Sequence, residues 1–184
     1  MLINNQYDQN TFTSLRFVPQ KIDNKLLRGQ AISNPIELYK LKKMGVNQVI
    51  DLRVHFLSRF FEVLMCKVFG IKYQNIKYSH TKSIFPSDNF FEHINDLILK
   101  NDGKTYIHCR HGKRRTGVCV AIYEKNHTDK TTKEILSEFH NIGFKDLILN
   151  SKKMSTKKYN KLVKIYNDFI EKFYPQEKKL DCKI

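Results

Sequence analysis

The chain has 184 residues, 41% of them hydrophobic and 28% charged, and a formal net charge of +15 at pH 7. This length suits one hydrophobic core and is short for two. No apolar run approaches the ~20 residues needed to cross a bilayer, and the polar N-terminus lacks the basic and apolar segments of a signal peptide. We therefore expect a cytoplasmic globular domain without a transmembrane segment.

The excess of positive charge has two interpretations, and the composition leaves both open. A lysine-rich, well-solvated surface would produce it without any functional meaning. The same charge would also attract anionic partners such as phosphate esters, polyphosphates, nucleic acid or acidic lipids. Nothing in the sequence indicates the oligomeric state.

The chain begins with a polar segment, residues 1–24, which predicts an extended lead-in. The apolar patterning that follows predicts strands alternating with helices. The expected strands are 25–29, 46–52, 71–78 and 105–108. The expected helices are 35–44, 56–69, 90–102, 113–125, 131–139 and 159–173. Residues 80–89 are expected to form a loop, and the charged tail 176–184 is expected to be loose.

The start of the first helix carries the clearest local signal. Asn34 can cap it, Pro35 suits the first helical position, and Glu37 sits where a capping-box partner belongs. The alternation of strands and helices predicts one α/β domain over residues 25–175, with a central, mainly parallel, four- to five-stranded sheet flanked by helices on both faces. Because ligands bind at the carboxyl ends of such strands, strand 105–108 should deliver the residues after it to the functional site.

The segment 108–117 reads HCRHGKRRTG and combines a cysteine, a glycine and an arginine at short intervals. Gly112 lets the loop turn sharply, and the helix after it directs free N–H groups and its positive dipole end at the loop. The same field would lower the pKa of Cys109 and give a thiolate nucleophile. Arg115 can bind two phosphate oxygens with its planar guanidinium, and Thr116 can donate its hydroxyl to the sulfur.

This segment resembles a known signature. It fits the HCxxGxxRTG loop of the protein tyrosine phosphatase superfamily at every defined position, and the stretches 27–30, 45–46 and 49–53 resemble compact dual-specificity-like members from bacteria, fungi and plants. The resemblance implies a two-step reaction without metal or cofactor. Cys109 would attack phosphorus and form a phosphocysteine, a carboxylic acid would protonate the leaving group, and the same carboxylate would activate water.

The remaining loop residues are the candidate substrate-binding groups. They are His108, expected to bond to the loop backbone, and Arg110, His111, Gly112, Lys113 and Arg114. Lys113 and Arg114 could also be ordinary surface residues. Beyond the loop, Arg53 and His55 follow strand 46–52 and could line the substrate mouth or form a surface ion pair.

The general acid is less clearly marked. Family members often carry an aspartate some thirty residues before the cysteine, but residues 77–80 contain no carboxylate. The nearest loop candidate is Asp88, which could equally cap the helix that begins there, and His80 is a lesser candidate. The family also includes members without a clear acid, which act on substrates with good leaving groups, such as polyphosphates.

The other cysteines suggest no second site. The four, Cys66, Cys109, Cys119 and Cys182, are widely spaced and form no CxxC pair, so neither a zinc site nor a dense disulfide framework is predicted. A reducing compartment would keep a reactive thiol free. Cys119 is expected to pack in the core. Cys66 could be a redox partner of Cys109, but apart from its presence nothing in the sequence indicates this role.

Three functions follow from this sequence. The first is a dual-specificity-like protein phosphatase acting on phosphorylated proteins. The second is a phosphatase of polyanionic non-protein substrates: a phosphoinositide, an inositol pyrophosphate or an RNA 5′-triphosphate. The third, a catalytically silent phosphate-binding module, is disfavoured because Cys109, Arg115 and Thr116 are all present.

Overall fold

The sheet at the centre of the molecule has the predicted, mainly parallel arrangement. The computed structural model describes residues 17–55, 57, 59–79, 84–143 and 155–173. Five strands pair in the order β1-β2-β5-β3-β4, and only the edge pair β1–β2 is antiparallel. Their bounds are Gln20–Lys21 (β1), Leu26–Gly29 (β2), Val46–Asp51 (β3), Lys72–Asn75 (β4) and Lys104–His108 (β5).

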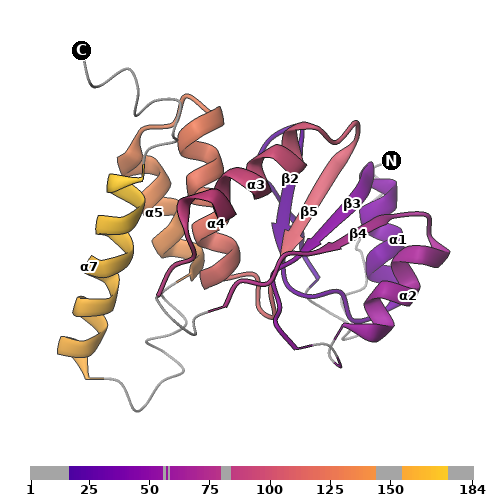
Figure 1. Cartoon of the computed structure of the whole chain (residues 1–184), viewed down its shortest axis with the longest axis horizontal. Coiled ribbons are helices and arrows are strands. Elements are labelled where there is room, and N and C mark those ends of the chain that lie inside the picture. Colours follow the sequence, from indigo (N-terminus) through magenta and orange to yellow (C-terminus); the bar gives the residue numbers. More distant parts are fainter. Residues whose placement is uncertain (1–16, 56, 58, 80–83, 144–154, 174–184) are drawn as a thin grey trace, which may run out of the picture.

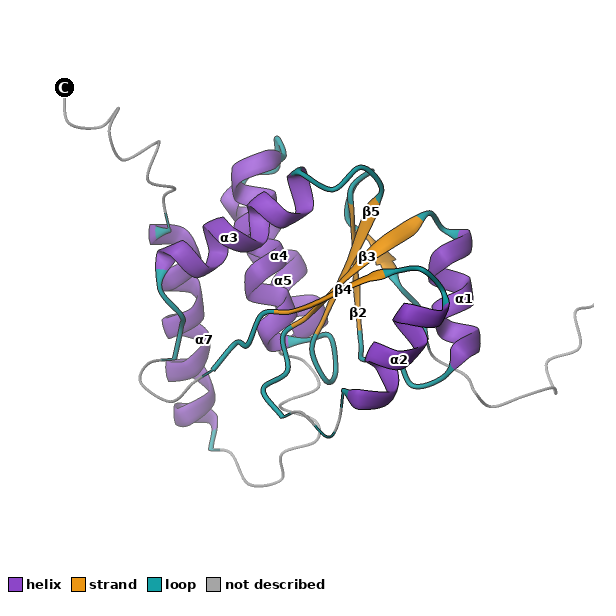
Figure 2. Ribbon diagram, turned by 45° about the vertical axis from the view of Figure 1, so that its right-hand side comes forward, coloured by secondary structure: helices purple, strands orange, loops and turns teal. Residues whose placement is uncertain are grey.

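Helices cover both faces of this sheet, as predicted (Figures 1 and 2). One layer contains α1 (Pro35–Lys43) and α2 (Phe60–Val68). The other contains α3 (Asp88–Leu99), α4 (Arg114–His127), α5 (Thr132–Gly143) and α7 (Thr156–Lys172). None of the helices in the described part of the chain is long and apolar enough to cross a membrane.

The start of α1 confirms the capping signal. The Asn34 side chain accepts a hydrogen bond from the backbone N–H of Glu37 at 3.0 Å, and the Glu37 carboxylate accepts one from the backbone N–H of Ser33 at 2.7 Å. Pro35 occupies the first turn, where its missing N–H costs nothing. The predicted helix 56–69 is shorter than expected and begins at Phe60.

Each layer of helices encloses its own hydrophobic cluster. The larger one lies under α3, α4, α5 and α7 and includes Ile122, Phe139 and the expected core residue Cys119, all at most 2% exposed. The smaller one lies under α1 and α2. Phe17 joins the smaller cluster and packs its ring 5.7 Å from that of Tyr106, so the end of the predicted lead-in contacts the core.

Candidate active site

The cysteine-containing loop leaves the carboxyl end of the central strand. β5 lies between β2 and β3, and its last residue, His108, pairs in register with Gly29 and Asp51. The loop then leads into α4, which begins at Arg114. The sheet therefore places the start of the loop at the edge where the parallel strands end, as the strand order predicted.

Two carbonyl groups of the loop accept hydrogen bonds from neighbouring segments of the backbone. The backbone N–H of Leu52 donates to the His108 carbonyl at 2.9 Å, and that of Ala31 donates to the Arg110 carbonyl at 3.2 Å. Each bond joins the loop to a segment that follows a neighbouring strand. These two bonds therefore fix the loop to both neighbouring strands.

Arg28, on β2, also donates hydrogen bonds to carbonyl groups of the loop. Its side chain is 4% exposed, and Nη2 donates to the Gly112 carbonyl at 2.8 Å and to the Lys113 carbonyl at 3.3 Å. Burial lowers the pKa of this guanidinium, and Glu124 and Cys109 partly offset that effect. Sequence reasoning did not assign Arg28 to the site, although it lies within the stretch 27–30 that resembles the family.

Gly112 is required by the shape of the loop. Its φ of +66° lies in the left-handed region that L side chains rarely adopt. A Cβ at this position would lie 2.2 Å from the Gly29 carbonyl oxygen, which is far inside van der Waals contact. The loop thus turns against the end of β2 with no room for a side chain.

Cys109 lies at the inner end of the loop and is 4% exposed. Burial by itself would raise the pKa of its thiol. Hydrogen bonds from the Thr116 side chain and from the backbone of Thr116 and His111, with the charge of Arg115, outweigh burial and bring the pKa below its ordinary value. Thr116 Oγ1 is buried and has no nitrogen or oxygen partner, which leaves the Cys109 sulfur for its hydroxyl.

Arg115 is held at the same edge of the sheet. Its Nη1 donates to the Leu52 carbonyl at 3.2 Å, and its charge helps to lower the pKa of Cys109. The guanidinium is therefore directed toward the carboxyl end of β3, and its charge acts on the Cys109 sulfur. This arrangement brings together Cys109, Arg115 and Thr116, which the sequence singled out.

The outer part of the loop is cationic. Arg110, His111 and Arg114 are exposed and Lys113 is half-buried. Burial and the neighbouring cations, Arg110 first, lower the pKa of His111, so its imidazole is neutral at physiological pH. The loop therefore presents fixed positive charge without depending on histidine protonation.

An ionic cluster of buried side chains lies beneath the loop. His108 Nε2 is 2.7 Å from Glu62 Oε1, and Arg53 pairs with both Glu62 and Asp51, the latter at 2.9 Å. The hydroxyl of Tyr73 donates to Asp51. Burial lowers the pKa of His108, but the charge of Glu62 outweighs it and the net shift is upward. Because His108 Nδ1 is 3.1 Å from the Cys109 carbonyl, this cluster supports the loop backbone.

The cluster corrects the expectation for Arg53. Its side chain is 8% exposed and pairs with two buried carboxylates, so it neither lines a substrate mouth nor forms a surface ion pair. The reason is that Asp51 points inward from the last position of β3 and needs a compensating charge. His108 is fully buried as well, so it supports the loop from below and does not face a substrate.

Three of these side chains could also be considered as metal ligands. Ligand atoms of Asp51, Glu62 and His108 lie within 4.8 Å of one another. However, the guanidinium of Arg53 donates to both carboxylates, and a second positive charge in the same buried space would be strongly repelled. The donor set therefore does not fit a divalent cation.

The surroundings of two other candidates, Asp88 and Cys66, are described by the structure. Asp88 is the first residue of α3, with Ser87 at the N-cap, and it lines a surface pocket with α7 residues Asp168, Phe169, Lys172 and Phe173. Its role as general acid stays a prediction. Cys66 is fully buried in the smaller cluster, and burial raises the pKa of its thiol to about 12. His80 and Cys182 lie outside the described residues.

Comparisons with known proteins support the fold. No protein-family model and no curated protein sequence matches the chain. Among solved structures, the core catalytic domain of the PP-IP phosphatase Siw14 from S. cerevisiae matches with a TM-score of 0.65 and 18% identity, covering 88% of each chain. TpbA from P. aeruginosa matches with a TM-score of 0.59 and 15% identity, covering 83% of this chain and 87% of its own.

A third solved structure extends the same result. PTPMT1 matches with a TM-score of 0.56 and 17% identity, covering 84% of this chain and 96% of its own. The chain therefore has the α/β fold of the dual-specificity-like cysteine phosphatases over most of its length. The signature segment 108–117 lies in that fold between the central strand and α4.

Proposed function

We propose that this protein is a cysteine-dependent phosphatase that hydrolyses phosphate monoesters through a phosphocysteine on Cys109. The observation that carries the proposal is a thiol whose pKa is lowered, although it is buried, by a hydroxyl, two backbone N–H groups and Arg115. A structural cysteine in an apolar core has its pKa raised, as Cys66 does. A stabilised thiolate beside an anion-binding loop is instead suited to attack phosphorus.

The reaction has two steps. In the first, the Cys109 sulfur forms a bond to phosphorus, the bond from phosphorus to the leaving oxygen breaks, and that oxygen takes up a proton. In the second, the oxygen of a water molecule bonds to phosphorus, the sulfur–phosphorus bond breaks, and inorganic phosphate leaves. Arg115 binds two of the phosphoryl oxygens, and the Thr116 hydroxyl stabilises the sulfur anion when it departs.

The source of the leaving-group proton bears on the substrate. No Asp or Glu occurs between Glu62 and Asp88 in the sequence. Asp88 is the general acid proposed from sequence, and it lines a surface pocket with residues of α7. A substrate whose leaving group is already a good one would need no such acid.

The first substrate candidate is a phosphorylated protein, as for dual-specificity-like phosphatases. The second is a polyanionic substrate: a phosphoinositide, an inositol pyrophosphate or an RNA 5′-triphosphate. Two observations favour this second candidate: the exposed cations Arg110 and Arg114 around the loop, and the fold likeness to Siw14, itself a PP-IP phosphatase.

Hydrolysis of an aryl phosphate in the presence of a metal chelator tests the chemistry. We expect activity to persist in chelator and to fall by roughly 10⁴–10⁶-fold in Cys109→Ser, because the nucleophile is lost. Cys119→Ala is the matched control, since it removes a neighbouring buried thiol of α4 and should leave the rate per folded molecule unchanged. Wild-type protein that binds phosphate but hydrolyses no ester would contradict the proposal.

A substrate panel separates the two candidates. Phosphopeptides, phosphoinositides, inositol pyrophosphates and RNA with a 5′-triphosphate should be compared at equal enzyme concentration. Asp88→Asn should slow esters with poor leaving groups more than those with good ones if Asp88 is the acid. Equal rates would remove Asp88 from the mechanism and favour polyanions that need no acid.

A further inference from the structure

Helix α2 has an unusual distribution of side chains. Its outward face carries large apolar groups: Phe60 is 62% exposed, Phe61 57%, Leu64 49% and Val68 75%. Leu57, just before the helix, is 90% exposed. A helix that is apolar on its outward side is normally covered by another element or by lipid, and isolated surface apolar residues do not form such a stripe.

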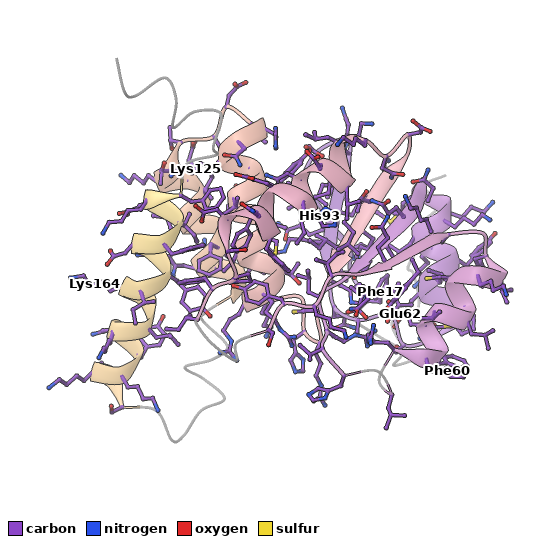
Figure 3. All side chains as sticks on the ribbon, in the orientation of Figure 1. Phe17, Phe60, Glu62, His93, Lys125 and Lys164 are labelled. Atoms are coloured by element: carbon purple, nitrogen blue, oxygen red, sulfur yellow. The ribbon has the colours of Figure 1, made fainter. Side chains whose placement is uncertain are left out.

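The inward face of the same helix buries a carboxylate, Glu62, beside the apolar Met65 and Cys66. Glu62 is 2% exposed and pairs with Arg53 and His108 beneath the loop. Figure 3 shows Glu62 directed toward the interior and Phe60 at the lower end of α2. The ionic cluster therefore uses the buried side of α2, while Phe60, Phe61, Leu64 and Val68 lie on the surface.

In the described part of the segment 30–87, which contains α1 and α2, the exposed charges are all positive. Between residues 30 and 87 the acidic residues are Glu37, Asp51 and Glu62, and each of them is buried. The exposed lysines of α1, α2 and β4 are Lys40, Lys42, Lys43, Lys67 and Lys72. Helix α1 adds two more exposed apolar side chains, Ile36 at 65% and Tyr39 at 50%.

We propose that the docking surface formed by Ile36, Tyr39, Phe60, Phe61, Leu64 and Val68 binds an anionic lipid bilayer. The apolar side chains would enter the boundary between headgroups and acyl chains, and the surrounding lysines would contact anionic headgroups. A second copy of this chain fits less well, because each copy carries a net charge of +15 and the docking surfaces would bring lysines together. Binding would not depend on catalysis.

Vesicle sedimentation tests this proposal directly. The full-length protein should bind vesicles containing about 30% phosphatidylserine in phosphatidylcholine and should not bind pure phosphatidylcholine. Raising the salt from about 0.05 M to about 0.5 M should weaken binding, since it screens the lysines. Failure of the folded protein to bind the anionic vesicles would overturn the proposal.

Substitutions on α2 locate the binding surface. The triple variant Phe61→Ser, Leu64→Ser and Val68→Ser should bind anionic vesicles roughly tenfold or more weakly. It should hydrolyse soluble aryl phosphate at the wild-type rate. The matched control is Leu99→Ser on α3, which removes an apolar side chain of similar exposure, 42%, and should bind normally. Equal vesicle binding by the triple variant and the wild type would show a diffuse charge effect and overturn the proposal.

A fluorescent reporter distinguishes lipid from other occupants. The chain contains no tryptophan, so Phe61→Trp supplies a single reporter and Leu99→Trp its control. Emission from position 61 should shift to the blue only when anionic vesicles are added, and brominated lipid should quench it. A blue-shifted emission without vesicles, or a dimer in light scattering that the triple variant loses, would assign this surface to a protein contact and overturn the proposal.

Discussion

The two layers of helices distribute their polar groups in opposite ways. On the α4 side a large apolar cluster fills the interior, the buried carboxylate of Glu124 pairs with Lys130, and α7 exposes lysines such as Lys161 and Lys164 to solvent. On the α2 side Glu62 is buried with Arg53, and the apolar residues Phe61 and Leu64 are exposed. The first layer follows the usual logic of a hydrophobic core. In the second layer, buried charges lie beneath the loop that carries Cys109.

This difference means that the layers should respond differently to mutation and to pH. Apolar burial is independent of pH and depends on side-chain volume. A buried ionic cluster depends on its protonation states and on every partner being present. Four experiments test the comparison, in order of decreasing effect.

The largest effect is expected from Glu62→Gln. Removal of this carboxylate leaves Arg53 and His108 with less compensating charge in a buried site, which should cost roughly 3–5 kcal/mol of stability. Urea denaturation measures the change. Glu171→Gln on the exposed side of α7 is the matched control and should change stability by less than about 0.5 kcal/mol. A loss as small as that of the control would mean that the cluster contributes nothing to stability.

The pH dependence of stability should also reveal the cluster. The hydrogen bond from Arg53 and the charge of His108 outweigh burial and lower the pKa of Asp51, so its contribution is complete above about pH 4 and is lost as the pH falls through the folded-state pKa. The pKa of His108 is raised, so its contribution is complete below about pH 6.5 and is lost as the pH rises through its folded-state pKa. Stability should therefore be highest between these limits.

Urea denaturation over about pH 3 to 9 measures this profile, in which each group changes the free energy of unfolding by at most about 1.4 kcal/mol per pH unit. Glu62→Gln should flatten its alkaline side, because the pKa of His108 would fall once the carboxylate is gone. An unchanged alkaline side in that variant would mean that Glu62 does not raise the pKa of His108.

A smaller effect is expected from Ile122→Val on the α4 side. This side chain is fully buried in the larger cluster, and loss of one methylene should cost about 0.5–1.5 kcal/mol. The loss should be the same at every pH at which the protein is folded, because no charge is involved. A pH-dependent loss would show that the two layers are not independent.

The smallest effect is expected from Leu64→Ser. Because this side chain is exposed on α2, its loss should change the stability in solution by less than about 0.5 kcal/mol. Thermal unfolding without lipid measures it. A loss of several kcal/mol would mean that the outward face of α2 is covered in solution.

Much of this organisation could be predicted from sequence. The strand and helix order followed from apolar periodicity, apart from the short strand β1, which lies in the predicted lead-in 1–24. The loop was marked by Cys109, Gly112 and Arg115 at fixed intervals. Its position at the carboxyl edge followed from the parallel sheet. These features depend on local sequence, so this one sequence was sufficient to predict them.

The ionic cluster could not be predicted in this way. Glu62 is surrounded in sequence by Phe60, Phe61, Val63 and Leu64, and apolar periodicity would direct those residues inward and the glutamate outward. Its partners, Arg53 and His108, belong to other segments of the chain. A signal was available in the helical spacing of Arg59, Glu62 and Cys66, which places these residues on one face of α2, but only the tertiary structure shows that this face is buried.

The attachment of the Cys109 loop to both neighbouring strands affects how far sequences with this fold can differ. Ala31 and Leu52 each fix one side of the loop through a backbone N–H group, which every residue except proline supplies. These two contacts therefore constrain few side chains, and the helix surfaces are free to vary. This accounts for a shared architecture at only 15–18% identity to Siw14, TpbA and PTPMT1.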